Sequence, residues 1–179
     1  MPPRVYLTGF MASGKSTVGP LLADRLGYRF VDLDWLVRAR TGRTIPELFA
    51  EGESVFRAAE ADALRETTGG EGLVVSTGGG TLVRPANLAV ARAAGPVVWL
   101  RTSVPTVVRR VGRNRGRPLL TDAAGRPLHG EALTARVRDL LAAREPLYAL
   151  ADLAIDADGS AEAVARDAAE ALAGWRRGT

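Results

Sequence analysis

Short apolar runs alternate along the chain with longer segments in which apolar residues recur at helical spacing. The runs predict strands over residues 4–8, 29–33, 72–76, 96–100 and 153–155. The helical spacing predicts helices over residues 15–26, 35–40, 45–50, 54–67, 85–94, 104–111, 131–150 and 161–175. Each strand is a continuous apolar run, as in parallel sheets with both faces covered. We therefore predict an α/β fold of three layers, α/β/α, around a five-stranded parallel sheet.

Composition indicates a single globular domain over residues 1–179, with 46% hydrophobic and 25% charged residues. The chain has no cysteine, which excludes disulfides and thiolate metal sites, and one histidine, His129, which leaves little for a zinc site. The apolar runs are shorter than a bilayer requires, and the N-terminus lacks the features of a signal peptide. We expect a cytoplasmic protein with no membrane partner.

The positive charges are unevenly distributed. Lys15 is the only lysine among 24 basic residues, which suggests a place where a compact ammonium group is needed. Six arginines and no acidic residue lie between positions 101 and 121. Such a segment indicates an anionic ligand, either a nucleic acid or a small polyphosphate, although a solvated helix face would give the same composition.

Residues 9–16 match the phosphate-binding pattern G-x-x-x-x-G-K-S/T, between a predicted strand and a predicted helix. The glycines let backbone N–H groups converge on phosphate oxygens, and the helix directs its positive end at the same anion. Lys15 would reach the β- and γ-phosphates, and the Ser16 hydroxyl would bind Mg²⁺. This is a P-loop NTPase-type arrangement. The residues expected to bind the nucleotide there are Gly9, Ala12, Ser13, Gly14, Lys15, Ser16 and Thr17.

Two aspartates, Asp32 and Asp34, lie at the end of the second predicted strand. A separation of two places both side chains on the same side of an extended chain. Neither of the next two predicted strands ends in an aspartate, so Asp32 is expected to serve Mg²⁺ and Asp34 to face an acceptor hydroxyl. The alternative is that the pair caps a helix or a turn.

Candidate groups for an acceptor molecule occur in three places. Arg57 and Glu60 are three apart on a predicted helix, so the carboxylate can hold the guanidinium as a bidentate site for an anion, with Glu53 assisting. An ordinary surface ion pair would give the same spacing. Three glycines at 78–80 follow the third strand and expose backbone to a small ligand. Arg144 is a second candidate for binding an anion.

Several motifs resemble those of the shikimate kinase family in order and spacing, over nearly the whole chain. They are Asp32-Leu33-Asp34, Phe49 with Gly52-Glu53, Phe56-Arg57 with Glu60, Ser76-Thr77-Gly78-Gly79-Gly80, Arg117-Pro118-Leu119-Leu120 and Arg144-Glu145-Pro146-Leu147-Tyr148. The resemblance implies ATP-dependent phosphorylation of the 3-hydroxyl of shikimate, a step toward aromatic amino acids, with Mg²⁺ assisting. ATP and shikimate are then the small-molecule partners.

The resemblance also implies roles for individual residues. Asp34 contacts the shikimate hydroxyls, Arg57 and Arg144 hold its carboxylate, and Gly78, Gly79 and Gly80 contact the ring through the backbone, with the acceptor-binding region at about 33–60. Arg117, on a mobile lid over about 112–130, reaches the transferring phosphate. Ser16 and Asp32 serve Mg²⁺, and Arg110 stacks on adenine, opposite a second wall around residues 156–160.

The sequence departs from the family pattern in two places. Ala12 stands where glycine is common, and the stretch 121–134, which contains Asp122, Arg126 and His129, is longer than usual. No role for that stretch follows from the sequence.

Three other functions compete with this interpretation. A kinase for gluconate or a nucleoside monophosphate would share the phosphate loop, but the pair Arg57 and Arg144 favours a carboxylate. A GTP switch would need an Asn-Lys-x-Asp motif, and the only lysine lies in the phosphate loop. A nucleic-acid binder would need aromatic residues interleaved with the basic segment. Aromatic residues make up only 6% of the whole chain, and none lies between the arginines of that segment. We expect a monomer that binds no nucleic acid.

Overall fold

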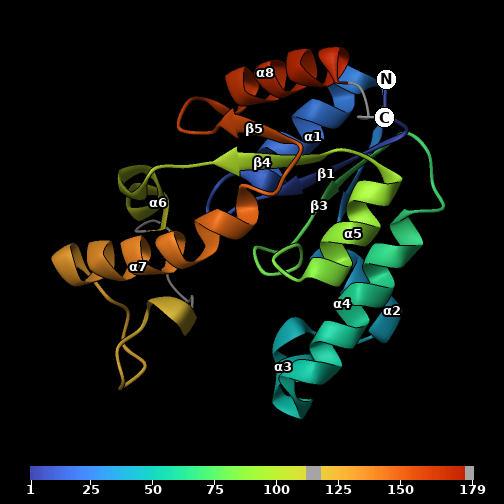
Figure 1. Ribbon diagram of the computed structural model, residues 1–179. Coiled ribbons are helices and arrows are strands. Elements are labelled where there is room, and N and C mark those ends of the chain that lie inside the picture. The colour runs from blue at the N-terminus through green and yellow to red at the C-terminus, as the bar shows by residue number, and fades with distance from the viewer. Residues whose placement is uncertain (112–117, 176–179) are drawn as a thin grey trace.

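The computed structural model describes residues 1–111 and 118–175. Its five strands form a single parallel sheet in the order β2-β3-β1-β4-β5. The strands are β1 (Arg4–Thr8), β2 (Arg29–Asp32), β3 (Leu73–Ser76), β4 (Val97–Arg101) and β5 (Leu153–Asp156). Because all strands run the same way, their carboxyl ends lie at one edge of the sheet (Figure 1). Ligands of open parallel sheets bind at that edge.

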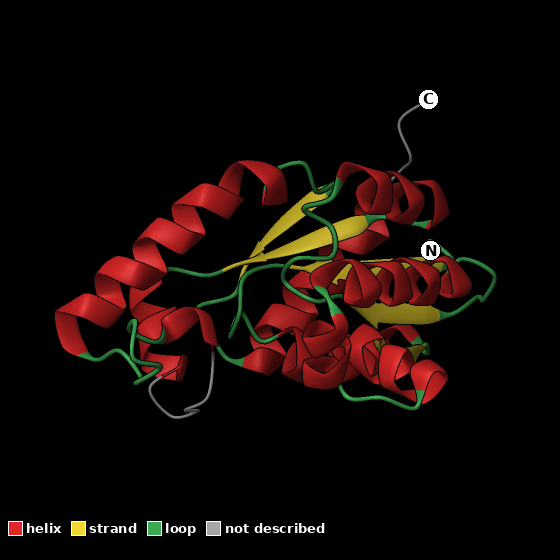
Figure 2. Cartoon of the chain, turned by 90° about the horizontal axis from the view of Figure 1, so that it is seen from below, coloured by secondary structure: helices red, strands yellow, loops and turns green. Residues whose placement is uncertain are grey.

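Helices cover both faces of the sheet, as predicted (Figure 2). They are α1 (Lys15–Leu26), α2 (Leu33–Thr41), α3 (Ile45–Glu51), α4 (Glu53–Thr67), α5 (Pro85–Ala94), α6 (Val104–Val111), α7 (Gly130–Tyr148) and α8 (Ala161–Gly174). Their bounds agree with the sequence prediction to within two residues. Helix α7 continues through Pro146 and ends two residues later.

Side chains of β1 alternate between two hydrophobic clusters. Val5 and Leu7 pack in a cluster with α1 and α8, whereas Tyr6 packs in the opposite cluster with α2, α4 and α5. Strands whose side chains are buried on both faces read as continuous apolar runs. The three-layer α/β/α prediction is therefore confirmed. A third cluster, around Trp99, joins α6 and α7 to the carboxyl end of the sheet.

The second strand ends earlier than we predicted. Leu33 begins α2, because the carboxylate of Asp32 accepts a hydrogen bond from the backbone N–H of Trp35 and caps the helix. Asp34 consequently lies in the first helical turn. Our expectation that Asp32 and Asp34 share one side of an extended chain was wrong, because it carried strand periodicity past the cap.

The long stretch after residue 120 folds into a compact turn. Thr121 and Pro127 form an antiparallel bridge, and the Asp122 carboxylate accepts hydrogen bonds from the N–H groups of Ala124 and Arg126, both at 2.9 Å. These hydrogen bonds hold the pKa of Asp122 below its usual range. The stretch is thus a self-closed hairpin after the short helix η1 (Pro118–Leu120). Residues 112–117 of the expected lid, with Arg117, lie outside the described residues.

The helices are too short or too polar to span a membrane in the part of the chain that the structure describes, residues 1–111 and 118–175.

Candidate active site

The loop between β1 and α1 wraps around the Lys15 ammonium. Its Nζ donates hydrogen bonds to the carbonyl oxygens of Gly9 and Phe10, at 2.7 and 2.9 Å, and to the Ser13 hydroxyl at 3.2 Å. Gly9 has φ +145°, and a Cβ there would lie 2.7 Å from the carbonyl oxygen of Leu100. This close approach needs glycine. Lys15, Ser16 and Thr17 form the first turn of α1, and the N–H of Thr17 donates to the carbonyl oxygen of Gly14 at 2.9 Å. The positive end of the helix therefore lies at the loop.

Ala12 adopts the left-handed conformation, with φ 58°, that explains why glycine is common there. Arg110 fixes this part of the loop: its guanidinium donates to the carbonyl oxygens of Ala12 and Ser13, at 3.2 and 3.4 Å. The same guanidinium donates to Ala157 and Gly159, at 2.8 and 3.4 Å. Arg110 therefore joins the phosphate loop to the segment after β5, a role for its guanidinium that sequence reasoning missed.

The segment after β5 is held to α6 at a second point. The carboxylate of Asp158 accepts a hydrogen bond from the backbone N–H of Ser103, at 2.9 Å, next to the first turn of α6. Asp158 and Arg110 thus fix the two ends of the contact between this segment and α6. The expected second adenine wall around residues 156–160 lies beside Arg110. The role of Asp158 was not predicted, because its partner is 55 residues away in the sequence.

The candidate magnesium ligands, Ser16 and Asp32, lie next to each other. The Ser16 hydroxyl donates to Oδ2 of Asp32 at 3.4 Å, while Oδ1 of Asp32 caps α2. The capping alternative and the metal alternative are therefore compatible, because they use different oxygens. Mg²⁺ binds few protein oxygens and keeps several waters, so this pair of hard oxygen ligands fits it.

Asp34 lines the cavity close to the glycine turn. A Cβ on Gly78 would lie 3.5 Å from Asp34 Oδ1 and 3.2 Å from Glu60 Oε1, so a side chain at position 78 would crowd both acids. Partial burial raises the pKa of Asp34, and the nearby charges of Asp32 and Glu60 raise it further, against the opposing effects of Lys15 and Arg38. A raised pKa is typical of a carboxylate that exchanges protons.

Arg57 is held by two carboxylates from its own helix. Its Nε and Nη2 donate to Oε1 of Glu53, both at 3.1 Å, and its Nη1 donates to Oε2 of Glu60 at 3.1 Å. Glu60 is only 1% exposed, and its Oε1 accepts a hydrogen bond from the Thr81 hydroxyl at 2.7 Å. The pair is therefore anchored in the core, unlike an ordinary surface ion pair. Thr81 was missed because its hydroxyl meets Glu60 only in the folded chain.

The glycine turn, residues 78–80, separates the two candidate anion-binding arginines. A Cβ on Gly80 would lie 3.3 Å from Nη1 of Arg57, and one on Gly79 would lie 3.7 Å from Nη1 of Arg144. The turn sits at the carboxyl end of β3, beside the phosphate loop, where the Gly9 carbonyl oxygen is 3.3 Å from the Gly79 Cβ position. Both guanidinium groups thus lie beside the half-buried backbone of the turn.

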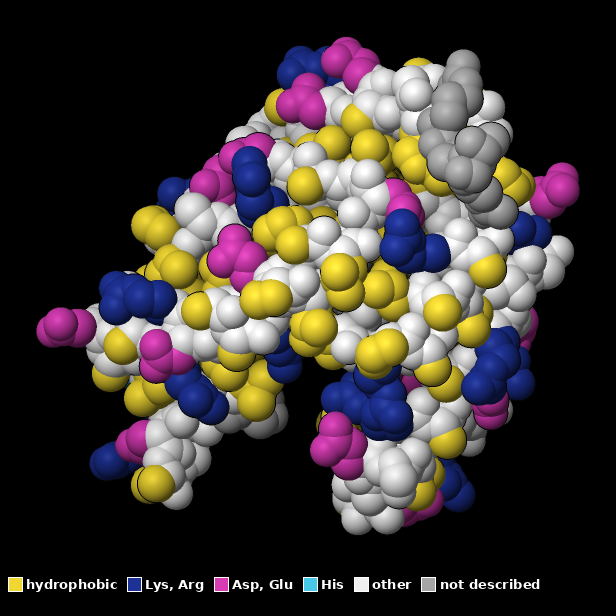
Figure 3. Space-filling model, viewed as in Figure 1, with side chains coloured by type: hydrophobic (Ala, Val, Ile, Leu, Met, Phe, Trp, Pro, Cys, Tyr) yellow, Lys and Arg dark blue, Asp and Glu magenta, His cyan; other side chains and the backbone are white. Residues whose placement is uncertain are grey.

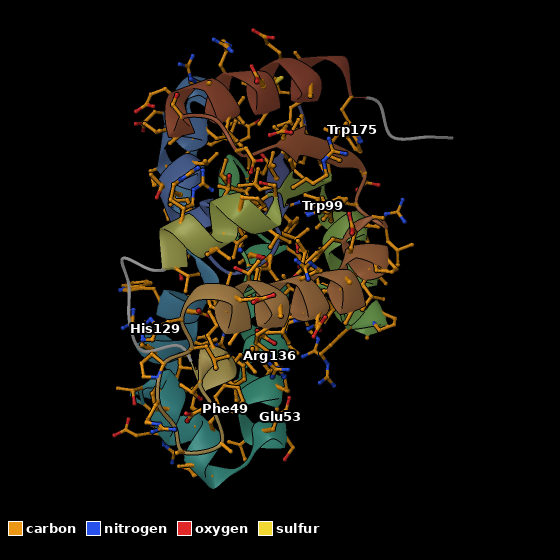
Figure 4. The ribbon with its side chains drawn as sticks, turned by 90° about the vertical axis from the view of Figure 1, so that its left-hand side faces the viewer. Phe49, Glu53, Trp99, His129, Arg136 and Trp175 are labelled. Carbon is orange, nitrogen blue, oxygen red and sulfur yellow. The ribbon has the colours of Figure 1, made fainter. Side chains whose placement is uncertain are left out.

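A cavity of about 740 Å³ lies between the phosphate loop and the glycine turn. Its lining includes the phosphate loop, Asp32, Asp34, the turn up to Gly79, and Arg110. This volume lies within the range of small-molecule sites. Figure 3 shows a hollow with basic side chains on its walls at the end of the molecule that holds α3 and the hairpin. Figure 4 shows Phe49 and Glu53 at that end of the molecule.

The structure brings together most of the residues proposed from sequence. The phosphate loop, Asp32, Asp34, Gly78, Gly79 and Arg110 line the cavity. Arg57 lies next to Gly80, and Arg144 next to Gly79, at the same turn. Arg117 lies outside the described residues, and its place in the site stays a prediction.

Comparisons with known proteins agree with this geometry. The family model "Shikimate kinase" matches residues 11–173. A shikimate kinase of Salinibacter ruber is 50% identical over 165 residues, covering 91% of this chain and 81% of that protein. One from Moorella thermoacetica is 42% identical over 177 residues, covering 98% and 97%.

Solved structures give the same result. The shikimate kinase of Bacteroides thetaiotaomicron superposes with a TM-score of 0.85 at 32% identity, covering 95% of this chain and 98% of that one. That of Acinetobacter baumannii, solved in complex with shikimate, superposes with a TM-score of 0.79 at 38% identity, covering 97% and 92%. A gluconokinase of Sinorhizobium meliloti, 20% identical with a TM-score of 0.63, shares the fold. Sequence and structure together show that this chain belongs to the shikimate kinase family.

Proposed function

We propose that the chain transfers the γ-phosphoryl group of ATP to the 3-hydroxyl of shikimate, with ATP on the phosphate loop and shikimate at the glycine turn. The chain is a shikimate kinase by family and phosphorylates shikimate with ATP. The observation that supports our placement is the pair Arg57 and Arg144 on either side of Gly79 and Gly80, next to Asp34. Two fixed guanidinium groups suit a carboxylate, and shikimate carries one.

On the nucleotide side, the phosphate loop supplies positive charge and orients the phosphates of ATP. Lys15 moves from the loop carbonyls to the β- and γ-phosphates, and the N-terminal amides of α1 bind phosphate oxygens. Ser16 and Asp32 would hold Mg²⁺, which neutralises phosphate charge when bound. Arg110 and the segment it holds after β5 form the wall for the base.

On the acceptor side, the two arginines that bind the shikimate carboxylate set the orientation of the reacting hydroxyl. Arg57 and Arg144 bind the carboxylate, and Asp34 accepts the 3-hydroxyl proton as the hydroxyl oxygen bonds to the γ-phosphorus. The bond between that phosphorus and the β,γ-bridging oxygen breaks, and ADP leaves. The protein thus contributes mainly positioning and charge neutralisation.

Further expectations come from the sequence alone. The phosphoryl-transfer role of Arg117, a lid over about 112–130, a single domain over residues 1–179, action as a monomer in the cytoplasm, and the absence of nucleic-acid or membrane partners all stay predictions.

The test of the proposed function is acceptor-dependent ADP release. We expect ADP production from ATP and Mg²⁺ to rise with shikimate and to stay at background with gluconate or a nucleoside monophosphate. Phosphorus NMR of the product should place the new phosphate on the 3-oxygen. Equal ADP release with gluconate would contradict the assignment of the acceptor.

Replacing Arg57 by alanine is expected to raise KM for shikimate about 10- to 100-fold, the size expected for a lost charge-assisted hydrogen bond pair. KM for ATP should change far less, because Arg57 lies on the acceptor side. Steady-state kinetics with each substrate varied in turn measures the split. Arg65→Ala is the matched control, since Arg65 forms an exposed pair with Asp62 three residues away on the same helix. An unchanged KM for shikimate in Arg57→Ala would reject this role.

A further inference from the structure

Tyr148 is a buried residue beside the acceptor site that the proposed reaction does not use. It is the last residue of α7 and is 1% exposed, with its ring 6.1 Å from that of Trp99. It lies four residues after Arg144, so the two side chains share one face of the helix. The burial of its ring fixes where its hydroxyl can point.

The Tyr148 hydroxyl binds the glycine turn and lies beside Arg144. It donates a hydrogen bond of 2.7 Å to the carbonyl oxygen of Gly79. The Arg144 guanidinium lies beside the same peptide: a Cβ on Gly79 would be 3.6 Å from the Tyr148 hydroxyl and 3.7 Å from Nη1 of Arg144. Burial raises the pKa of Tyr148 although Arg144 opposes this, so the hydroxyl stays protonated at neutral pH and keeps donating. The hydroxyl therefore lies at the point where Arg144 meets the glycine turn.

The bond to Gly79 constrains more than one atom of the turn. The carbonyl of Gly79 and the N–H of Gly80 belong to one planar trans peptide, so they point in opposite directions. Because Tyr148 anchors this oxygen, the N–H of Gly80 points away from α7. Gly80 itself lies next to the Arg57 guanidinium. Three successive glycines have no side chains with which to fix this peptide, and glycine has the widest conformational freedom.

We propose that Tyr148 is a positioning residue for the acceptor: its hydroxyl holds the Gly79–Gly80 peptide and the Arg144 guanidinium in the arrangement that receives shikimate. The inference rests on the proposed function, because it deepens the acceptor site described there. Tyr148 itself touches backbone and Arg144, so its effect on the reaction is transmitted through them.

Tyr148→Phe tests the proposal, because it removes the hydroxyl and keeps the ring in its packed position. We expect KM for shikimate, and its dissociation constant measured by calorimetry, to rise about fivefold, the scale of one buried hydrogen bond. KM for ATP should stay within about twofold of the parent, because the lost hydrogen bond holds the acceptor side of the site. Arg144 and the turn would both relax.

Tyr6→Phe is the matched control. The Tyr6 hydroxyl is also buried, and its one partner given by the structure is the Thr67 hydroxyl at 3.2 Å, away from the cavity lining. It should lower thermal stability much as Tyr148→Phe does and leave both KM values unchanged. This comparison separates a general loss of stability from a loss of acceptor positioning.

Two results would overturn the proposal. Unchanged shikimate affinity in Tyr148→Phe would show that the hydroxyl does not position the site. An equal rise in KM for ATP and for shikimate would show a general disturbance instead. In both cases the parent protein still phosphorylates shikimate, whereas failure of the proposed function would appear in the parent protein itself.

Discussion

Replacing Lys15 by alanine is expected to lower kcat by about 10³-fold, because the loss of a preorganised charge at the transferring group has effects of that order. Lys15 is the one ammonium in a chain whose other basic side chains are guanidinium groups. Its Nζ already lies within 2.7 to 3.2 Å of three loop oxygens, so a short movement brings it to the phosphates of a bound nucleotide. Initial rates at saturating ATP and shikimate measure the loss.

Lys15→Arg makes this prediction specific to the ammonium group. The guanidinium is planar and larger, and the loop that surrounds Nζ leaves room for a compact group, so we expect this variant to lose nearly as much activity. Shikimate binding by calorimetry should persist in both variants, since the acceptor groups lie across the cavity. Activity of Lys15→Arg within about threefold of the parent would show that charge alone suffices.

Asp34→Asn is expected to lower kcat by about 10²- to 10⁴-fold, the range for loss of a positioned general base. The amide keeps the shape of the carboxylate but cannot accept the proton of the 3-hydroxyl. The same substitution should raise the stability of the folded protein. Because the pKa of Asp34 is raised in the folded protein, its ionised form at neutral pH costs folding free energy, and that cost disappears in asparagine.

The pH dependence of kcat gives a second readout for Asp34. The reaction needs the ionised carboxylate, so activity should fall as pH decreases through its raised pKa, at a higher pH than for an ordinary aspartate. Asp24→Asn, at the exposed far end of α1, should leave both kcat and the acid limb unchanged. An acid limb that persists unaltered in the residual activity of Asp34→Asn would assign it to another group.

The order of elements and the phosphate loop could be predicted from sequence because their causes are local. Apolar runs and glycine positions fix β1, the loop and α1 over some twenty consecutive residues, each interacting with near neighbours. The Arg57 and Glu60 pair was predictable for the same reason, since residues three positions apart on a helix are neighbours on its surface. In each case the geometry follows from the backbone alone.

The acid pair shows where local reasoning fails. Asp32 and Asp34 were assigned to an extended chain. A single hydrogen bond from the Trp35 N–H to the Asp32 carboxylate instead caps α2, which begins at Leu33. Both aspartates still reach the cavity, for a reason different from the one predicted. Asp34 does so from the first turn of α2, close to Gly78.

By itself, then, the sequence determined the strand and helix order, the phosphate loop and the ion pair on α4, because short-range steric and periodic constraints decide these. Only the tertiary structure decided that Gly79 and Gly80 lie between Arg57 and Arg144, that Arg110 binds loop carbonyls, and that Tyr148 holds the turn. The Tyr148 and Arg110 contacts join residues 69 and 98 positions apart. Such pairings depend on how helices pack against the sheet, which no local pattern encodes.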